Sequence, residues 1–198
     1  MTLRSFVLCA SAGLAAASGQ VRTEGTCDHP FSADIQPGQT IRMHLRSGDI
    51  RIRGSAEEKL AVACELDNGN PADDVRLSFR SRQGSADLDV RGGPSNHFRL
   101  RIAVPRNSNL FVRSPAGALK VEDVTGDKDV ELHAGDLQIE VGDAAEYRHA
   151  DASVVAGDLD GRAFGIRKGG LFRSFSKSNS AGKYRLHAHV AAGDVVLR

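Results

Sequence analysis

The sequence has no tryptophan, and aromatic residues make up only 5% of its 198 residues. A core built from this chain must therefore consist mainly of valine, leucine, isoleucine and alanine. Basic and acidic residues nearly balance, at 26 and 25, so the formal net charge is +1. This balance provides no general attraction to nucleic acid or anionic lipid. A chain of this length can form one domain or two small ones.

The chain also lacks an N-terminal apolar run of membrane-spanning length, because residues 6–17 are too few to cross a bilayer. Arg4 precedes this run and small residues at 15–19 follow it, which is typical of a secretory signal peptide. We therefore predict a signal peptide over residues 1–19 of an exported protein that is periplasmic or extracellular. The alternative interpretation is a short N-terminal helix.

Cysteine is scarce, with three residues in the whole chain. Cys9 lies inside the predicted signal peptide and leaves with it. Cys27 and Cys64 then remain as a pair in an oxidising compartment, where the simplest use of two cysteines is one disulfide. Such a bridge would tie the N-terminus of the mature chain onto a strand. The alternative is two free, buried thiols.

Apolar and polar residues alternate repeatedly over residues 39–104, as in 41–45 and 50–53. A period of two is typical of strands with one buried face. The segment 67–71 carries turn residues that separate such strands, and no sustained helical stripe occurs in this half. We predict that residues 20–104 form antiparallel N-terminal strands of a single all-β domain spanning residues 20–198.

A repeated strand-turn unit follows over residues 105–198 and centres on Ala-Gly-Asp or a close variant of it. Its glycines are Gly117, Gly135, Gly157 and Gly193, and a related Ser-Gly-Asp surrounds Gly48. A unit of about twenty residues is typical of stacked repeat proteins. The longest gap, before the last unit, contains a segment rich in serine and glycine, and we predict a loop there over residues 169–182.

Side-chain direction supports this alignment, because residues at odd distances from each glycine share one face of a strand. The positions three before the glycines are Ser114, Leu132, Val154 and Val190, and the positions two after them are Leu119, Leu137, Leu159 and Val195. Even positions are mostly charged or polar. The odd face is therefore the predicted core. We expect a solenoid-like stack of single strands with Gly-Asp turns, and the alternative is a β-sandwich of hairpins.

The strand Leu100–Pro105, followed by the Ala-Gly-Asp-Leu units, resembles the bacterial β-strand-repeat family known as the putative adhesin domain, a domain of unknown function. The resemblance covers residues 39–198 and includes the closing strand Tyr184–His189. It implies an exported or membrane-tethered protein with a β-solenoid fold. It implies no catalytic residues.

The aspartates of the Gly-Asp turns would stack at equivalent positions, which raises the question of cation sites. However, the Gly-Gly-x-Gly-x-Asp pattern that builds calcium sites in β-rolls is absent from the sequence. The simpler interpretation is that glycine supplies a positive φ angle while aspartate caps nearby backbone amides.

A sharper chemical hypothesis concerns His187 and His189, which lie two residues apart on the polar face of one predicted strand. The repeat alignment places Asp151 and Ser153 in the equivalent columns of another unit. Two imidazoles and a carboxylate suit zinc or copper, so His187, His189 and Asp151 are candidate metal ligands. The simpler interpretation is that outward polar residues of strands contact only water.

Catalytic motifs are missing from the sequence, including Gly-x-Ser-x-Gly, His-Glu-x-x-His and a phosphate-binding glycine loop. We therefore expect no catalytic residues and no cofactor. The expected function is a non-enzymatic, adhesin-like structural or binding role in the cell envelope, with a protein or polysaccharide as partner and self-association through a terminal strand. One alternative is a carbohydrate-active enzyme using carboxylates such as Asp129 and Glu131. Another is a metal-binding envelope protein.

Overall fold

The computed structural model describes residues 21–36, 38–66, 72–93 and 97–198. Its strands join into one 14-stranded sheet, and the helical elements of this described part are two short 3-10 turns. The predicted all-β fold is therefore confirmed. The predicted signal peptide, residues 1–19, lies outside the described residues.

The strands follow one another along the chain with short connections. Strands β1 to β7 are Val21–Cys27, Phe31–Asp34, Thr40–His44, Gly48–Ser55, Lys59–Leu66, Ala72–Arg82 and Ser85–Gly92. Strands β8 to β14 are Phe98–Pro105, Asn109–Glu122, Lys128–Ile139, Tyr147–Gly161, Ile166–Ser178, Tyr184–Ala192 and Val195–Leu197. The 3-10 turns are η1 (Ala144–Glu146) and η2 (Arg162–Phe164).

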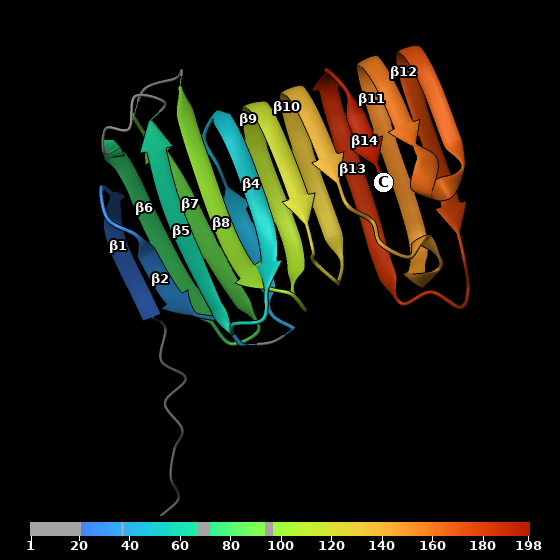
Figure 1. Cartoon of the computed structure of the whole chain (residues 1–198). Helices are drawn as coiled ribbons and strands as arrows, with labels where there is room; N and C mark the ends of the chain where they lie inside the picture. The colour runs from blue at the N-terminus through green and yellow to red at the C-terminus, as the bar shows by residue number, and fades with distance from the viewer. Residues whose placement is uncertain (1–20, 37, 67–71, 94–96) are drawn as a thin grey trace, which may run out of the picture.

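The strands form two layers around one apolar core (Figure 1). Layer A contains β1, β6, β7, β3, β13 and the first halves of β9, β10 and β11. Layer B contains β2, β5, β8, β4, β14 and the second halves of those long strands. Each long strand crosses between the layers at its Ala-Gly step, so that β9 pairs first with β3 and then with β4. We call each pass through both layers a rung.

The repeat alignment predicted from the sequence agrees with the strand register. Gly117 pairs with both Gly48 and Gly135 in parallel strands. The predicted core face is also correct, because the apolar residues at odd positions are buried. They include Val112, Leu119, Val130, Leu132, Leu137, Val154, Leu159, Val190 and Val195.

The order of the rungs in space differs from their order in the sequence. The last repeat unit, formed by β13 and β14, lies between β10 and β11 and is parallel to both (Figure 1). The reason is that β12 folds back antiparallel along the outer edge of β11 and occupies the end of the stack. The last unit is then inserted between the two rungs that precede it in the chain.

The predicted antiparallel pairing of the N-terminal strands is only partly correct. Strands β1 and β6, β6 and β7, β2 and β5, and β5 and β8 are antiparallel. Strands β3 and β4, however, are parallel to all of their partners, which are β7, β8 and β9. Alternation along the chain indicates a strand but carries no information on the direction of its neighbour.

The predicted loop at residues 169–182 is wrong for most of its length, because residues 166–178 form strand β12. Its serine and glycine content is tolerated since β12 is a terminal strand and is largely exposed. The ammonium and guanidinium groups of Lys168, Arg173 and Lys177 donate hydrogen bonds to backbone carbonyl oxygens of this end of the stack, at 2.7, 2.6 and 2.8 Å. Cations at a terminal strand oppose its pairing with another chain.

The two cysteines predicted to pair lie together at the other end of the stack. The Cα atoms of Cys27 in β1 and Cys64 in β5 are 5.4 Å apart, and their sulfur atoms are within bonding distance. Because β1 belongs to layer A and β5 to layer B, this bridge joins the two layers.

Close backbone contacts align the rungs where the chain crosses between layers. We call Gly48, Gly117, Gly135, Gly193 and Gly157 the glycine ladder, in their spatial order. A Cβ atom on Gly135 would lie 2.0 Å from the carbonyl oxygen of Gly117, and one on Gly193 would lie 2.0 Å from that of Gly135. Their φ angles are also positive, at 118° and 133°. Any side chain at these positions would push neighbouring rungs apart.

Substituting a ladder glycine should therefore destabilise the fold more than substituting a glycine that is only a turn residue. Gly142 is the matched control, since its φ angle is +72° but a Cβ atom added to it would meet no other atom within 4 Å. We expect Gly142→Ala to cost about 1–2 kcal/mol and Gly135→Ala more than about 3 kcal/mol of unfolding free energy. Denaturant unfolding at pH 7 measures both, and equal losses would contradict the role of the ladder.

Candidate functional site

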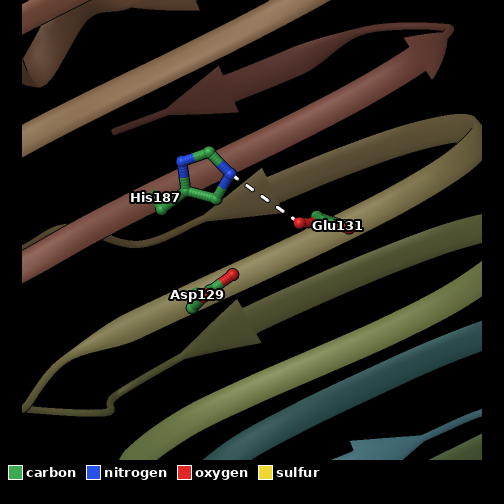
Figure 2. Close-up of side chains that lie close together, drawn as sticks. All are labelled: Asp129, Glu131 and His187. Atoms are coloured by element: carbon green, nitrogen blue, oxygen red, sulfur yellow. Dashed lines mark ion pairs between the residues drawn. The ribbon is translucent and has the colours of Figure 1, made fainter.

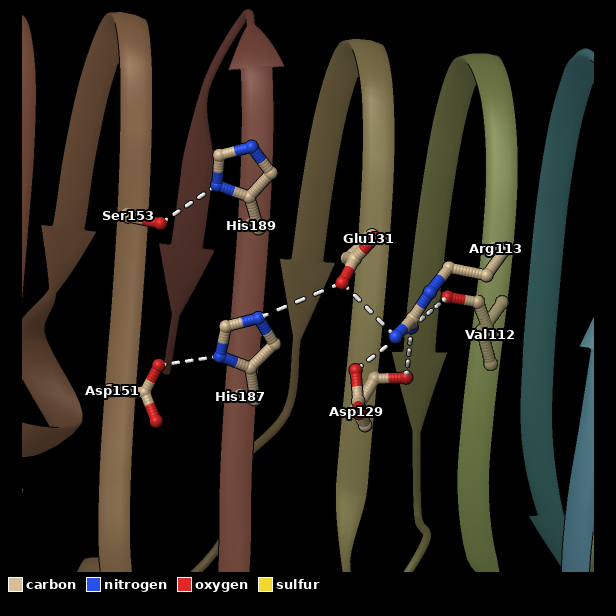
Figure 3. Close-up of polar contacts among 8 residues, drawn as sticks. All are labelled: Val112, Arg113, Asp129, Glu131, Asp151, Ser153, His187 and His189. Carbon is tan, nitrogen blue, oxygen red and sulfur yellow. Dashed lines mark hydrogen bonds and ion pairs between the residues drawn. The ribbon is translucent and has the colours of Figure 1, made fainter.

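The outer surface of layer A carries a connected set of polar side chains, which we call the polar ladder. The parallel register aligns Arg113, Glu131, His189 and Ser153 in one row and Phe111, Asp129, His187 and Asp151 in the next. All of these residues except Phe111 belong to the polar ladder (Figure 3). Each lies at an even distance from its ladder glycine, and this places its side chain on the face opposite the core.

Arg113 holds one end of the polar ladder. Its Nη1 lies 2.8 Å from Asp129 Oδ1, and its Nη2 lies 3.0 Å from Glu131 Oε1. Nη1 also donates to the carbonyl oxygen of Val112 at 3.0 Å, and the guanidinium lies 3.7 Å from the centroid of the Phe111 ring. These contacts fix the guanidinium between two carboxylates of the neighbouring strand.

His187 links the next strands. Its Nδ1 lies 2.5 Å from Asp151 Oδ2, and its Nε2 lies 3.9 Å from Glu131 Oε1 (Figures 2 and 3). A carboxylate only accepts hydrogen bonds, so the proton belongs on Nδ1. Asp151 also lies within 3.4 Å of His149 Nε2, so polar contacts continue from β9 through β10 and β13 to β11.

The predicted metal ligands His187, His189 and Asp151 do not gather around one point. His187 and Asp151 contact each other, whereas His189 Nδ1 pairs with the Ser153 hydroxyl at 2.7 Å (Figure 3). The register predicted for these residues is correct, since Asp151 pairs with His187 and Ser153 with His189. Each histidine, however, contacts the residue opposite it in its own row. The two rows lie two residues apart along the strand, so the two histidines do not share a ligand position.

A different group has the spacing of a metal site. Among the described residues, Asp129, Glu131 and His187 form the one group of three potential ligands whose donor atoms all lie within 4.8 Å of one another (Figure 2). The repeat alignment placed Asp129 and His187 in one column and Glu131 in the next. It did not indicate that their strands are neighbours, because β13 is inserted beside β10 only in the folded chain.

The chemistry of this group suits a divalent cation only if Arg113 moves. Two carboxylates and one imidazole are ordinary zinc ligands, and their side chains are 39–43% exposed, so an ion can reach them. Arg113 already pairs with both carboxylates. A bound cation must therefore displace the guanidinium or share the carboxylates with it, which weakens binding.

A shallow groove of about 460 Å³ lies beside the polar ladder on layer A. Its polar lining includes His44, Arg113, Glu131, His133 and His189. The groove places hydrogen-bond donors and acceptors next to one another on an open surface. Such a surface can recognise an extended ligand.

The carboxylates proposed for acid-base chemistry are arranged differently from those of a glycosidase. Asp129 and Glu131 lie on the same strand and are both bound by Arg113. Acid-base hydrolysis instead requires two carboxyl groups on opposite sides of a substrate bond.

One of the turn aspartates, Asp194, caps a backbone amide as expected. The Asp194 carboxylate accepts a hydrogen bond from the Asp158 backbone amide in the neighbouring rung, at 2.8 Å.

A second polar cluster lies inside the molecule. The Lys128 side chain is 1% exposed, and its Nζ donates to the Tyr147 hydroxyl at 2.5 Å. Burial lowers the pKa of Lys128 to about 8, although nearby Asp127 and Glu146 act in the opposite direction. Burial likewise raises the pKa of Tyr147, whose hydroxyl donates to the carbonyl oxygen of Val141 at 3.3 Å. These contacts satisfy buried polar groups between β10 and β11 and are out of reach of a large ligand.

Comparison with known proteins defines the fold more than the function. No family model and no curated protein sequence matches the chain. A crystal structure of a "putative cell adhesion protein" from Clostridium sporogenes ATCC 15579 is similar, with a TM-score of 0.51 and 9% identity over 85% of this chain and 98% of that one. This likeness shows a shared fold. In the described part of the chain, no helix is long and apolar enough to span a bilayer.

The buried lysine generates a prediction for stability. In the unfolded chain Lys128 keeps its ordinary pKa of 10.5, whereas the folded value is about 8. Between these values the unfolded state binds more protons, so the unfolding free energy should rise by about 2 kcal/mol from pH 7 to pH 9.5. Chemical denaturation at both pH values measures this rise. Lys128→Met should abolish it, and a rise of equal size in the variant would contradict the assignment.

Proposed function

We propose that this chain is an exported, non-enzymatic protein of the cell envelope with an adhesin-like binding or structural role. Its binding face is the polar ladder together with the groove beside it. The observation that carries this proposal is the lateral pairing of the ladder side chains across four strands. Because Arg113, Glu131, His187 and Asp151 are held by one another, the surface is ordered before a partner arrives, and less conformational entropy is lost on binding.

Two further observations support the envelope role. The Cys27–Cys64 bridge suits an oxidising compartment, where disulfides persist. The shared fold with a protein described as a putative cell adhesion protein is consistent with a binding function, although fold alone does not define function. The sharing of Asp129 and Glu131 by one arginine favours a binding face over a hydrolytic site.

Location and adhesion can be tested with the full chain. In a Gram-negative host we expect the protein in the periplasmic or surface fraction with Cys27 and Cys64 unreactive to thiol reagents. Surfaces coated with the purified protein should retain bacterial cells, and Arg113→Gln with His187→Gln should reduce retention at least threefold. Arg101→Gln is the control, because Arg101 pairs with Glu65 on layer B.

Two results would contradict the proposal. One is a purely cytoplasmic location with free thiols. The other is the release of reducing ends from polysaccharides by the wild-type protein, which would make the chain an enzyme. If the variant Arg113→Gln/His187→Gln retains cells as well as the wild-type protein, the polar ladder is not the binding face.

A second candidate function is divalent-cation binding at Asp129, Glu131 and His187, which the spacing of their donor atoms favours. Calorimetric titration with Zn²⁺ should show weak binding to the wild-type protein. Arg113→Gln should bind at least tenfold more tightly, because it frees two carboxylates. Adding His187→Ala to that variant should abolish binding, whereas adding His189→Ala should leave it unchanged. Failure of Arg113→Gln to bind Zn²⁺ would eliminate this candidate.

A further inference from the structure

A second groove on layer A carries an unusual concentration of arginine. It has a volume of about 630 Å³ and crosses the outer faces of β1, β6 and β7, at the end of the stack opposite β12. The charged residues that line it are Arg22, Arg76, Arg80, Arg91, Glu24 and Asp89. Four cations thus face two anions in a protein whose net charge is only +1. We call this surface the arginine groove.

Strand pairing places like charges directly opposite one another in the arginine groove. Arg22 in β1 pairs with Arg80 in β6, and Arg76 in β6 pairs with Arg91 in β7. On its other side Arg80 lies opposite Asp87 in β7, although no ion pair joins these two described residues. Directly opposed like charges destabilise an antiparallel sheet. The register of these strands is determined by their buried faces, which include Leu77 and Phe79, so the arginines cannot move apart by a shift of one residue.

Only the outer strands of the groove supply counter-charges. Glu24 pairs with Arg22 at 2.5 Å, and Asp89 pairs with Arg91 at 3.1 Å. Arg76 and Arg80, on the central strand, have no ion pair with any residue that the structure describes. They lie four positions apart on the same face of β6, which corresponds to roughly 14 Å along the strand. This contrasts with Arg113 in the polar ladder, which has two carboxylate partners.

We propose that the arginine groove is a second binding surface, separate from the polar ladder, and that it binds an acidic polysaccharide; the inference goes beyond the proposed function. Arg76 and Arg80 would each bind one carboxylate or sulfate group, because a guanidinium forms paired hydrogen bonds to planar oxyanions. Between them, Ser78, Glu24 and Asp89 present hydroxyl and carboxylate oxygens that accept hydrogen bonds from sugar hydroxyl groups.

The alternation of charge along the groove favours this ligand over other polyanions. Each strand of a nucleic-acid duplex carries a phosphate about every 3.4 Å of helix axis, so its phosphates would also face Glu24 and Asp89. An anionic bilayer likewise presents closely spaced charges. A polysaccharide with acidic groups separated by neutral, hydroxyl-bearing units matches two cationic positions with hydrogen-bond acceptors between them.

The test uses the full, disulfide-bonded chain and purified polymers of defined chemistry. Hyaluronate supplies one carboxylate and κ-carrageenan one sulfate per disaccharide, each separated from the next by a neutral, hydroxyl-bearing sugar, while neutral dextran is the uncharged comparison. We expect the wild-type protein to bind at least one acidic polymer at low salt and to ignore dextran. Arg76→Gln with Arg80→Gln should weaken that binding at least tenfold in calorimetric or electrophoretic titrations.

A matched double variant separates a specific groove from general charge attraction. Arg51→Gln with Arg53→Gln changes the net charge equally, but these arginines lie on layer B and pair with Glu122 and Asp123. It should retain binding within twofold of the wild-type protein. The thermal midpoint of Arg76→Gln/Arg80→Gln without polymer should stay close to that of the wild type, since repulsion from Arg22 and Arg91 and attraction to Asp87 are removed together.

Several results would overturn the inference. These are absence of binding to both acidic polymers, equal weakening by the two double variants, and tighter binding to single-stranded DNA or to anionic phospholipid vesicles than to the polysaccharides. The ladder variant Arg113→Gln/His187→Gln should keep polysaccharide affinity. Loss of cell retention in that variant, with no effect of Arg76 and Arg80 on polymer binding, would leave the proposed function intact and reject only the arginine groove.

Discussion

Backbone contact within the glycine ladder is the constraint on which the rest of the structure depends. A Cβ atom on Gly117, Gly135 or Gly193 would lie 2.0 Å from the carbonyl oxygen of the neighbouring ladder glycine. A side chain can change rotamer to make room, but a carbonyl group in a sheet can move only with its strand. The ladder thus sets the position at which each rung crosses between layers, and it aligns the buried columns on both sides of the crossing.

This alignment also creates the surface chemistry of layer A. Neighbouring strands lie about 4.8 Å apart, so equivalent residues of successive rungs can contact one another directly. The inserted rung β13 brings His187 between Asp151 and Glu131. If β11 had followed β10 directly, acidic residues would have faced acidic residues, since Asp129 and Asp151 occupy the same column. Insertion of β13 places imidazoles between these carboxylates.

The two ends of the stack use positive charge in different ways. At the β12 end, Lys168, Arg173 and Lys177 donate hydrogen bonds to carbonyl oxygens of the chain itself. This arrangement protects a terminal strand from pairing with another molecule. At the β1 end, Arg76 and Arg80 project from the outer face of the sheet without a carboxylate partner among the described residues. The cations at the β12 end thus bind the chain's own backbone. Under our proposal, Arg76 and Arg80 at the β1 end bind a ligand.

The sequence by itself determined the strands other than β12, the faces of the repeat that are buried, the crossing glycines and the columns containing Asp129, Asp151 and His187. These are local properties, because side-chain alternation and positive φ angles depend on a few neighbouring residues. Only the tertiary structure decided that β12 is a strand, that β3 and β4 have parallel neighbours, and that β13 lies beside β10. Those choices depend on which strand edges remain free after other strands have paired. The grouping of Asp129, Glu131 and His187 and the pairing of opposed arginines both follow from them.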